Sequence, residues 1–150
     1  MAAALLEMAA GFAGADEVGE RAAVLRGQLL QDGERELQSY EPVLAAVRLP
    51  RDDPSRSERI AEALSVASEA PLEIAHVSAE VAELAAAVAG QSKSSLGGDA
   101  IAAAVLAEAA TRAAARLVEI NLLDSADDSR LGEVANLAGR AAAARERALG

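Results

Sequence analysis

The feature that most constrains the fold of this chain is its abundance of alanine, combined with an almost complete lack of aromatic side chains. Phe12 and Tyr40 are the only two aromatic residues among 150. Alanine is the best helix former, and β-branched clusters with alternating polarity do not occur in the sequence. The sequence therefore predicts an all-α fold.

Alanine also determines how such helices pack. Its side chain buries little apolar area, so helices must approach closely and each contact contributes little. With 150 residues, 52% of them hydrophobic, the chain has the size of one domain. We expect a single domain over residues 1–150. We also expect a homodimer, because pairing with a second copy adds burial to a marginal core.

Prolines and glycines divide the chain into helices. The apolar spacing predicts a long helix over residues 16–47, kinked near Pro42, with one buried face. Asp53 followed by Pro54 starts a helix, and Pro71 either kinks that helix or starts the next one. The prediction is an alanine-rich, up-and-down bundle of about five to six helices, some kinked at proline. The predicted helices are 1–13, 16–47, 54–70, 71–89, 99–122 and 129–148.

Charge and residue types argue against several classes of function. The net charge of −10 and the pI of about 4.6 disfavour nucleic acid and anionic membranes as partners. Cysteine is absent, which removes thiolate chemistry, and His76 is the only histidine, so we predict no metal site. The first 15 residues are apolar but lack a positively charged start. They do not resemble a secretory signal, and we expect a cytoplasmic protein.

A polar segment stands out in the second half of the chain. It runs from Ser94 to Gly98-Asp99 and leads into an apolar helix that ends near Asn121. A helix N-terminus carries unpaired N–H groups and a partial positive charge, which hold anions and orient carboxylates. We expect Asp99 at or near the cap of this helix. Asn121 falls on the apolar side, where it either contacts a ligand or makes an interhelical hydrogen bond.

Several local patterns occur together in a characteristic order. They are, along the chain, Leu30-Gln31-Asp32, Ser39-Tyr40-Glu41-Pro42-Val43, Leu49-Pro50, a helix with Arg59, Ala70-Pro71-Leu72-Glu73-Ile74-Ala75, a loop with Lys93, Gly98-Asp99, and Asn121-Leu122. In this order and spacing the chain resembles the cyclodeaminase/cyclohydrolase family of folate enzymes over roughly residues 1–123. This family includes the C-terminal domain of formiminotransferase-cyclodeaminase and methenyltetrahydrofolate cyclohydrolases.

The chain departs from the family pattern at its N-terminus. Members typically begin with a Pro-rich Gly-Gly-Gly-Ser turn and an alanine-rich helix, whereas only the tail of that helix, residues 2–12, is present here. We interpret the chain as N-terminally shortened. If the glycine turn helps to build the folate pocket, the chain is an incomplete enzyme.

The resemblance implies a formiminotetrahydrofolate cyclodeaminase or a methenyltetrahydrofolate cyclohydrolase. Both reactions pass through a tetrahedral carbon between N5 and N10 and need a nearby proton donor or acceptor. The tetrahydrofolate derivative is the substrate, and no covalently bound cofactor is implied. Asp99 is then a catalytic carboxylate, although an N-cap role also accounts for it. Lys93, the only lysine, is a second catalytic candidate or else a solvated loop residue.

Asp32, Tyr40 and Asn121 are candidate substrate contacts. Asp32 and Tyr40 stand about two helical turns apart, so they share a helix face and can form a polar pocket, although Tyr40 also fits a core position. Folates carry glutamate tails and the chain is acidic, so arginines must gather at the pocket rim. The candidates for this rim are Arg51, Arg56 and Arg59.

A second class of function remains open. The missing glycine turn and the scarcity of catalytic residue types also fit a non-catalytic, degenerate dimerisation module of the same fold. Such a module forms a stable dimer and binds no ligand. A coiled-coil scaffold is disfavoured, because four prolines break the chain and no heptad pattern persists through three or four repeats.

Overall fold

The computed structural model describes residues 1–91 and 97–150, and all regular structure within them is helical. The helices are α1 (Ala2–Ala13), α2 (Asp16–Ser39), α3 (Glu41–Val47), α4 (Arg56–Ala67), α5 (Glu69–Gln91), α6 (Gly98–Asn121) and α7 (Ser129–Leu149). Only Tyr40 separates α2 from α3, and only Ser68 separates α4 from α5. The seven described segments therefore form five rods, which confirms the predicted all-α bundle.

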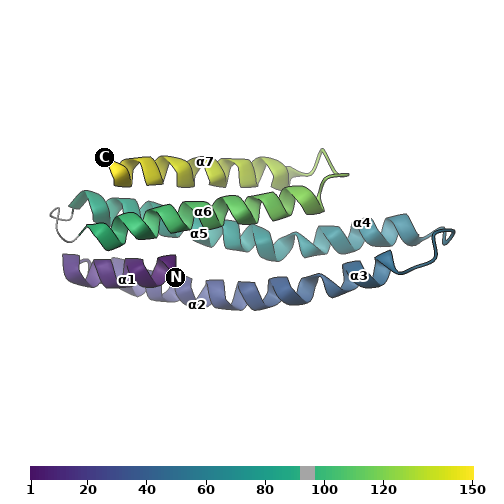
Figure 1. Ribbon diagram of the computed structural model, residues 1–150, viewed down its shortest axis with the longest axis horizontal. Coiled ribbons are helices and arrows are strands. Elements are labelled where there is room, and N and C mark those ends of the chain that lie inside the picture. Colours follow the sequence, from purple (N-terminus) through teal and green to yellow (C-terminus); the bar gives the residue numbers. More distant parts are fainter. Residues whose placement is uncertain (92–96) are drawn as a thin grey trace.

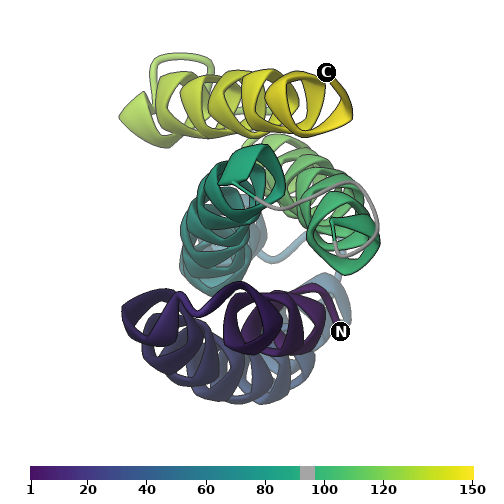
Figure 2. The ribbon, with the colours of Figure 1, turned by 90° about the vertical axis from the view of Figure 1, so that its left-hand side faces the viewer.

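The rods lie side by side in three layers (Figure 2). α1 and α2 form one outer layer, α5 and α6 form the middle layer, and α7 covers α5 and α6 from the other side. Figure 1 shows that α3 and α4 extend past the end of α6 and α7 as a hairpin. We call these two helices and the loop between them, residues 41–67, the α3–α4 hairpin.

Small side chains make up the core, as the alanine content predicts. Buried alanines of α1, α2, α5, α6 and α7 form one continuous cluster, in which Leu6 and Leu25 are among the largest fully buried side chains. The α3–α4 hairpin contributes only Val43, Ala46 and Ala67 to the buried apolar residues. Close helix contact through alanine thus holds the body together, and the hairpin stands partly outside it. No described helix is long and apolar enough to cross a bilayer.

The breaks between helices fall close to the predicted prolines and glycines. Gly14 ends α1 in the left-handed conformation, with a φ of 70°, and its N–H donates to carbonyls of the last turn. Pro42 lies in the first turn of α3 and Pro71 in the first turn of α5. An N–H is not needed for helix bonding at such positions, so both prolines follow a break and neither kinks a continuous helix.

Two helix starts rest on aspartate side chains. Asp53 Oδ1 accepts hydrogen bonds from the Ser55 backbone N–H at 2.8 Å and from its hydroxyl at 2.7 Å, and α4 begins at Arg56, two residues later than predicted. Asp128 caps α7 by accepting from the Arg130 N–H at 3.0 Å. Asp53 thus orders the turn before α4, and Asp128 orders the turn before α7.

The predicted buried face of residues 16–47 is only partly buried. Leu25 and Val43 are buried, but Val24 and Leu37 are 53% and 80% exposed. Helical periodicity shows that apolar residues share a face, whereas burial depends on which neighbours cover it. α2 lies in an outer layer and α3 lies past the ends of α6 and α7, so much of this face is left uncovered.

Candidate functional site

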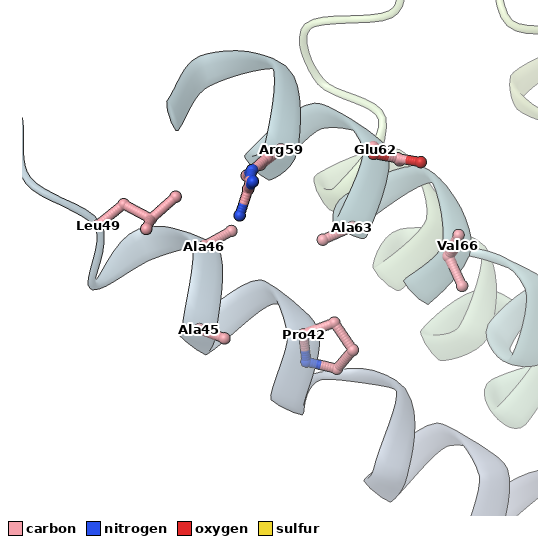
Figure 3. Close-up of a pocket in the computed structure, with 8 residues that line it drawn as sticks. All are labelled: Pro42, Ala45, Ala46, Leu49, Arg59, Glu62, Ala63 and Val66. Carbon is pink, nitrogen blue, oxygen red and sulfur yellow. The ribbon is translucent and has the colours of Figure 1, made fainter. Parts of the chain in front are cut away.

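The α3–α4 hairpin forms the walls of an open hollow. Its volume is about 700 Å³, and it lies between α3 and α4 near the free end of the bundle. Figure 3 shows the two helices forming its walls. The lining residues are Pro42, Ala45, Ala46, Leu49, Arg59, Glu62, Ala63 and Val66. We call this space the Arg59 hollow.

Arg59 provides the positive charge of this hollow. In Figure 3 its side chain points between the helices toward Ala46, while Glu62 points away. The Arg59 backbone N–H donates to the Ser55 carbonyl at 3.0 Å, but its guanidinium makes no hydrogen bond or ion pair with any described residue. Its charge acts at longer range on Asp53, whose pKa is lowered mainly by the hydrogen bonds from Ser55 and additionally by Arg59. A guanidinium with unused donors beside apolar walls is suited to binding a carboxylate.

The other two rim arginines have different positions. Arg56 donates from Nε to the Leu49 carbonyl at 3.3 Å and from Nη2 to the Val47 carbonyl at 3.1 Å. It therefore satisfies carbonyls at the end of α3 and ties the two helices of the hairpin together. Arg51 is exposed in the connecting loop. Of the three predicted rim arginines, only Arg59 lines the hollow.

A second hollow lies on the opposite side of α4, against the end of α6. Its volume is about 320 Å³, and we call it the Asn121 hollow. It is lined by Ser57, Ile60, Ala61, Leu64, Ile120, Asn121, Leu123, Asp124 and Ser125. Asn121 Nδ2 donates to the Ala67 carbonyl at 3.2 Å, at the end of α4. Asn121 therefore makes the interhelical hydrogen bond, and its Oδ1 accepts none from the described residues.

Asp99 lies at the other end of α6. It is half-buried and is the second residue of the helix, which follows Gly97 at the N-cap position. No side chain caps this helix, so Asp99 stands in its first turn and does not act as the cap. A carboxylate there is favoured by the partial positive charge of the helix start. Lys93 falls outside the described residues.

A single chain does not bring Asp99 and Asn121 together. The two residues stand 22 positions apart on one uninterrupted helix. At a rise of 1.5 Å per residue they are separated by about 33 Å. A tetrahedral carbon cannot contact both side chains across that distance. Within one chain, Asp99 and Asn121 therefore do not line one pocket.

Asp32 and Tyr40 are not brought together as a polar pocket either. Asp32 is buried and accepts a hydrogen bond from Arg35 Nη1 at 3.1 Å. Tyr40 lies at the break after α2 and is 48% exposed. Neither residue lines the Arg59 hollow or the Asn121 hollow. Tyr40 has helical backbone angles and continues the rod of α2 into α3, so the two residues lie on one rod but differ in burial.

Several residues that line the Arg59 hollow lie in the parts of the sequence that carry the family resemblance. Pro42, Leu49 and Arg59 belong to the ordered patterns that suggested the family, and of these only Arg59 was a site candidate, as a rim arginine. The only signal for them was the sequence run from Pro42 to Arg59. This run covers α3, the start of α4 and the loop between them, and the two helices pack against each other. Within the described part of the chain, no three histidine, cysteine or carboxylate side chains are grouped to hold a metal ion.

Comparison with known proteins now identifies the family. The family model for formiminotransferase-cyclodeaminase matches residues 1–139. The chain belongs to this family. The structure is also similar to the crystal structure of formiminotetrahydrofolate cyclodeaminase from Thermotoga maritima, with a TM-score of 0.81 and 20% sequence identity. That match covers 99% of this chain and 79% of the other, and at this identity it establishes the shared fold. A comparison with curated proteins found no match.

Proposed function

We propose that this member of the formiminotransferase-cyclodeaminase family is an enzyme of folate one-carbon metabolism. The observation that carries the proposal is the family match over residues 1–139. The activity is that of a formiminotetrahydrofolate cyclodeaminase or a methenyltetrahydrofolate cyclohydrolase. The fold shared with the Thermotoga maritima enzyme supports the same class of reaction.

Either reaction requires a proton transfer close to one carbon atom of the substrate. In the deaminase reaction, N10 attacks the formimino carbon on N5 and ammonia leaves, which gives the 5,10-methenyl ring. In the hydrolase reaction, water adds to the methenyl carbon and the ring opens. We assign the proton transfer to Asp99, with Lys93 as a second candidate, because a carboxylate or an amine can hold or release the proton at the tetrahedral stage.

The Arg59 hollow is the proposed anchor for the acidic end of the substrate. Its volume of about 700 Å³ lies within the range of small-molecule sites, which is roughly 300–1,000 Å³. Most of its lining is apolar, and Arg59 offers unused donors to a carboxylate. The Asn121 hollow on the other side of α4 offers amide and hydroxyl groups to a pterin ring. The substrate itself is a tetrahydrofolate derivative, and the protein acts in the cytoplasm as a homodimer.

The first test follows the absorbance of 5,10-methenyltetrahydrofolate with the purified chain, starting from 5-formiminotetrahydrofolate. Appearance of the methenyl band supports deamination, and loss of added methenyl compound supports hydrolysis. Arg59→Ala raises KM and leaves kcat nearly unchanged, because it removes a contact far from the reacting carbon. Arg48→Ala is the matched control, since Arg48 is exposed on the same hairpin and lines neither hollow. Absence of both reactions contradicts the proposal.

One observation favours a second candidate function. Asp99 and Asn121 are about 33 Å apart in a single chain, and a degenerate, non-catalytic dimerisation module has no need to bring them together. This candidate predicts no binding of reduced folate. Titration calorimetry with tetrahydrofolate separates the two, because saturable heat excludes the module and its absence at millimolar folate supports it.

A further inference from the structure

Helix α4 forms a wall of both hollows, although little of it is buried in the body of the protein. It contributes Arg59 and Val66 to the Arg59 hollow, and Ile60 and Leu64 to the Asn121 hollow. Ala67 is the only buried residue of α4, all of which is described. Apolar burial therefore does little to fix the angle at which this helix stands to the rest of the bundle.

A single arginine at the start of α7 binds the last turn of α4. Arg130 donates from Nη1 to the Ser65 carbonyl and from Nη2 to the Ser65 hydroxyl, both at 2.8 Å. Its Nε and Nη2 also donate to the two carboxylate oxygens of Asp128, at 3.0 and 2.7 Å. These bonds use four of the five N–H groups of the guanidinium, and the side chain is only 20% exposed. We call Arg130, Asp128 and Ser65 the Arg130 clamp.

The Arg130 clamp lies at the joint between α4 and α5. Ser68, the one residue between these helices, is fully buried, and its hydroxyl donates to the Leu64 carbonyl at 2.9 Å. Asn121 donates to the Ala67 carbonyl at 3.2 Å. Asn121 and Arg130 flank the turn between α6 and α7, so this turn is attached to α4 at both of its ends. Polar contacts, rather than burial, thus hold this end of α4.

We propose that Arg130 is a positioning residue, which holds α4 at the angle at which the two hollows receive the two ends of the substrate. This inference rests on the proposed function for the identity of the substrate, whereas the clamp itself rests on the contacts above. Arg130 does not line either hollow formed by the described residues. It therefore acts on the substrate only through α4.

The length of α4 amplifies any movement at the joint. Arg59 stands nine residues before Ser68, which is about 14 Å along the helix axis. A rotation of about 10° at Ser68 therefore moves Arg59 by roughly 2.4 Å. Binding groups must be held within about 0.5 Å of their productive positions. Loss of the clamp thus weakens binding in both hollows without removing any group that contacts the substrate.

The set of acceptors in the clamp requires an arginine. A guanidinium presents its donors in a fixed plane, so it can bind a carboxylate on one edge while it binds a carbonyl and a hydroxyl on another. A lysine ammonium is a point charge without this fork and keeps only part of the set. Asp128 also caps α7 by accepting from the Arg130 backbone N–H at 3.0 Å. That bond remains when the Arg130 side chain is removed, so the start of α7 stays capped.

Hydrogen exchange measured by mass spectrometry tests the clamp without reference to activity. Arg130→Ala should speed exchange in α4 about tenfold, because the helix loses its charged contacts to α7. Arg140→Ala is the matched control. Arg140 also lies on α7 and binds another helix, through two hydrogen bonds of 2.9 Å to Glu83 of α5, but none of its hydrogen bonds reaches α4. Unchanged exchange in α4 of Arg130→Ala, or equal acceleration there in the control, overturns the clamp.

Separate measurement of KM and kcat tests the positioning role. Arg130→Ala should raise KM for the tetrahydrofolate substrate about five- to tenfold and change kcat by less than about twofold, because it removes no group that contacts the substrate or transfers its proton. Arg130→Lys should recover part of the lost affinity. Ser65→Ala removes only the hydroxyl acceptor, so it should raise KM less and add little to Arg130→Ala. Circular dichroism confirms that each variant is folded, and Arg140→Ala should leave both constants unchanged.

The two measurements separate failure of the clamp from failure of the proposed function. If the wild-type protein converts neither folate, the proposed function fails, and hydrogen exchange still decides whether Arg130 holds α4. If the wild-type protein is active and α4 of Arg130→Ala exchanges faster while KM stays unchanged, the positioning role is overturned. An equal rise of KM in Arg140→Ala overturns it as well, because any loss of an interhelical ion pair would then have the same effect.

Discussion

Two alanines of α6 provide a direct test of how this core is packed. Ala104 and Ala107 are both fully buried, one turn apart on the same helix. Ala107 lines the apolar hollow of about 270 Å³ between α1, α2, α5 and α6, whereas Ala104 lines none of the hollows described. Replacing each by leucine adds the same three carbons in two different surroundings.

The two replacements are expected to have opposite effects. Ala104→Leu forces atoms into a filled contact and lowers the free energy of unfolding by about 1–3 kcal/mol. Ala107→Leu extends into the hollow, where three added carbons contribute up to about 2.4 kcal/mol. Ordering the new side chain offsets about 0.5–1 kcal/mol of this. The variants should therefore differ by roughly 2–5 kcal/mol.

Urea unfolding followed by circular dichroism measures this difference. The slope of the unfolding free energy against urea concentration should stay constant, and the midpoints should move apart. Thermal unfolding provides a second reading, since each kcal/mol shifts the Tm of a chain of this size by about 2–4 °C. Equal losses for both variants would refute the reasoning, because they would show that the hollow has no room for a larger side chain.

Three further predictions concern single positions outside the proposed site. Gly14→Ala lowers the free energy of unfolding by about 1–2 kcal/mol, because Gly14 has a φ of 70°. Gly11→Ala within the same helix raises the free energy of unfolding by about 0.5–1 kcal/mol, and thermal melts compare the two variants. The pKa of Asp128 is lowered to about 2, mainly by the hydrogen bond from the Arg130 side chain and next by the hydrogen bond from the Arg130 backbone N–H. The stability that the Asp128 carboxylate adds is thus complete above about pH 4 and is lost as the pH falls through about 2. Asp128→Asn keeps a capping oxygen but does not titrate, so its urea midpoint should change less with pH over this range. Arg56→Ala frees two carbonyls at the end of α3, so limited proteolysis within residues 48–55 becomes faster while the Tm of the body stays unchanged.

The positions of the helices follow from local chemistry, and the sequence was sufficient to predict them. Gly14, Pro42, Pro71 and Asp128 each act within one turn of their own position, so their effects are independent of the final packing. The predicted starts and ends therefore fall close to those observed. The same holds for the all-α class, which depends on alanine throughout the chain.

Which surfaces are covered cannot be deduced from such local rules. Leu37 and Leu25 both belong to the apolar face of α2, yet Leu37 is largely exposed and Leu25 is fully buried. Alanine adds to the ambiguity, because it is small enough to stand at a core contact or at the surface. Periodicity defines a face, and only the arrangement of the other helices decides whether that face is buried.

How the candidate residues are arranged could be deduced from the sequence only in part. Asp99 and Asn121 were placed at the two ends of one predicted helix, and a helix of that length keeps its ends about 33 Å apart. The sequence alone therefore contained the reason why one chain cannot join them. The Arg59 hollow depends instead on α3 folding back along α4, a tertiary contact that no local pattern specifies.

The sparse burial of the α3–α4 hairpin has a consequence for the order in which the protein opens. The hairpin contributes three buried apolar side chains, whereas the body is held by a continuous cluster across five helices. Segments with few buried contacts open at a lower free energy than the global transition. Amide hydrogens of α3 and α4 should therefore exchange with solvent before those of α5 and α6. A ligand bound in either hollow slows that exchange. Part of its binding free energy is used to keep the hairpin closed, which lowers its apparent affinity.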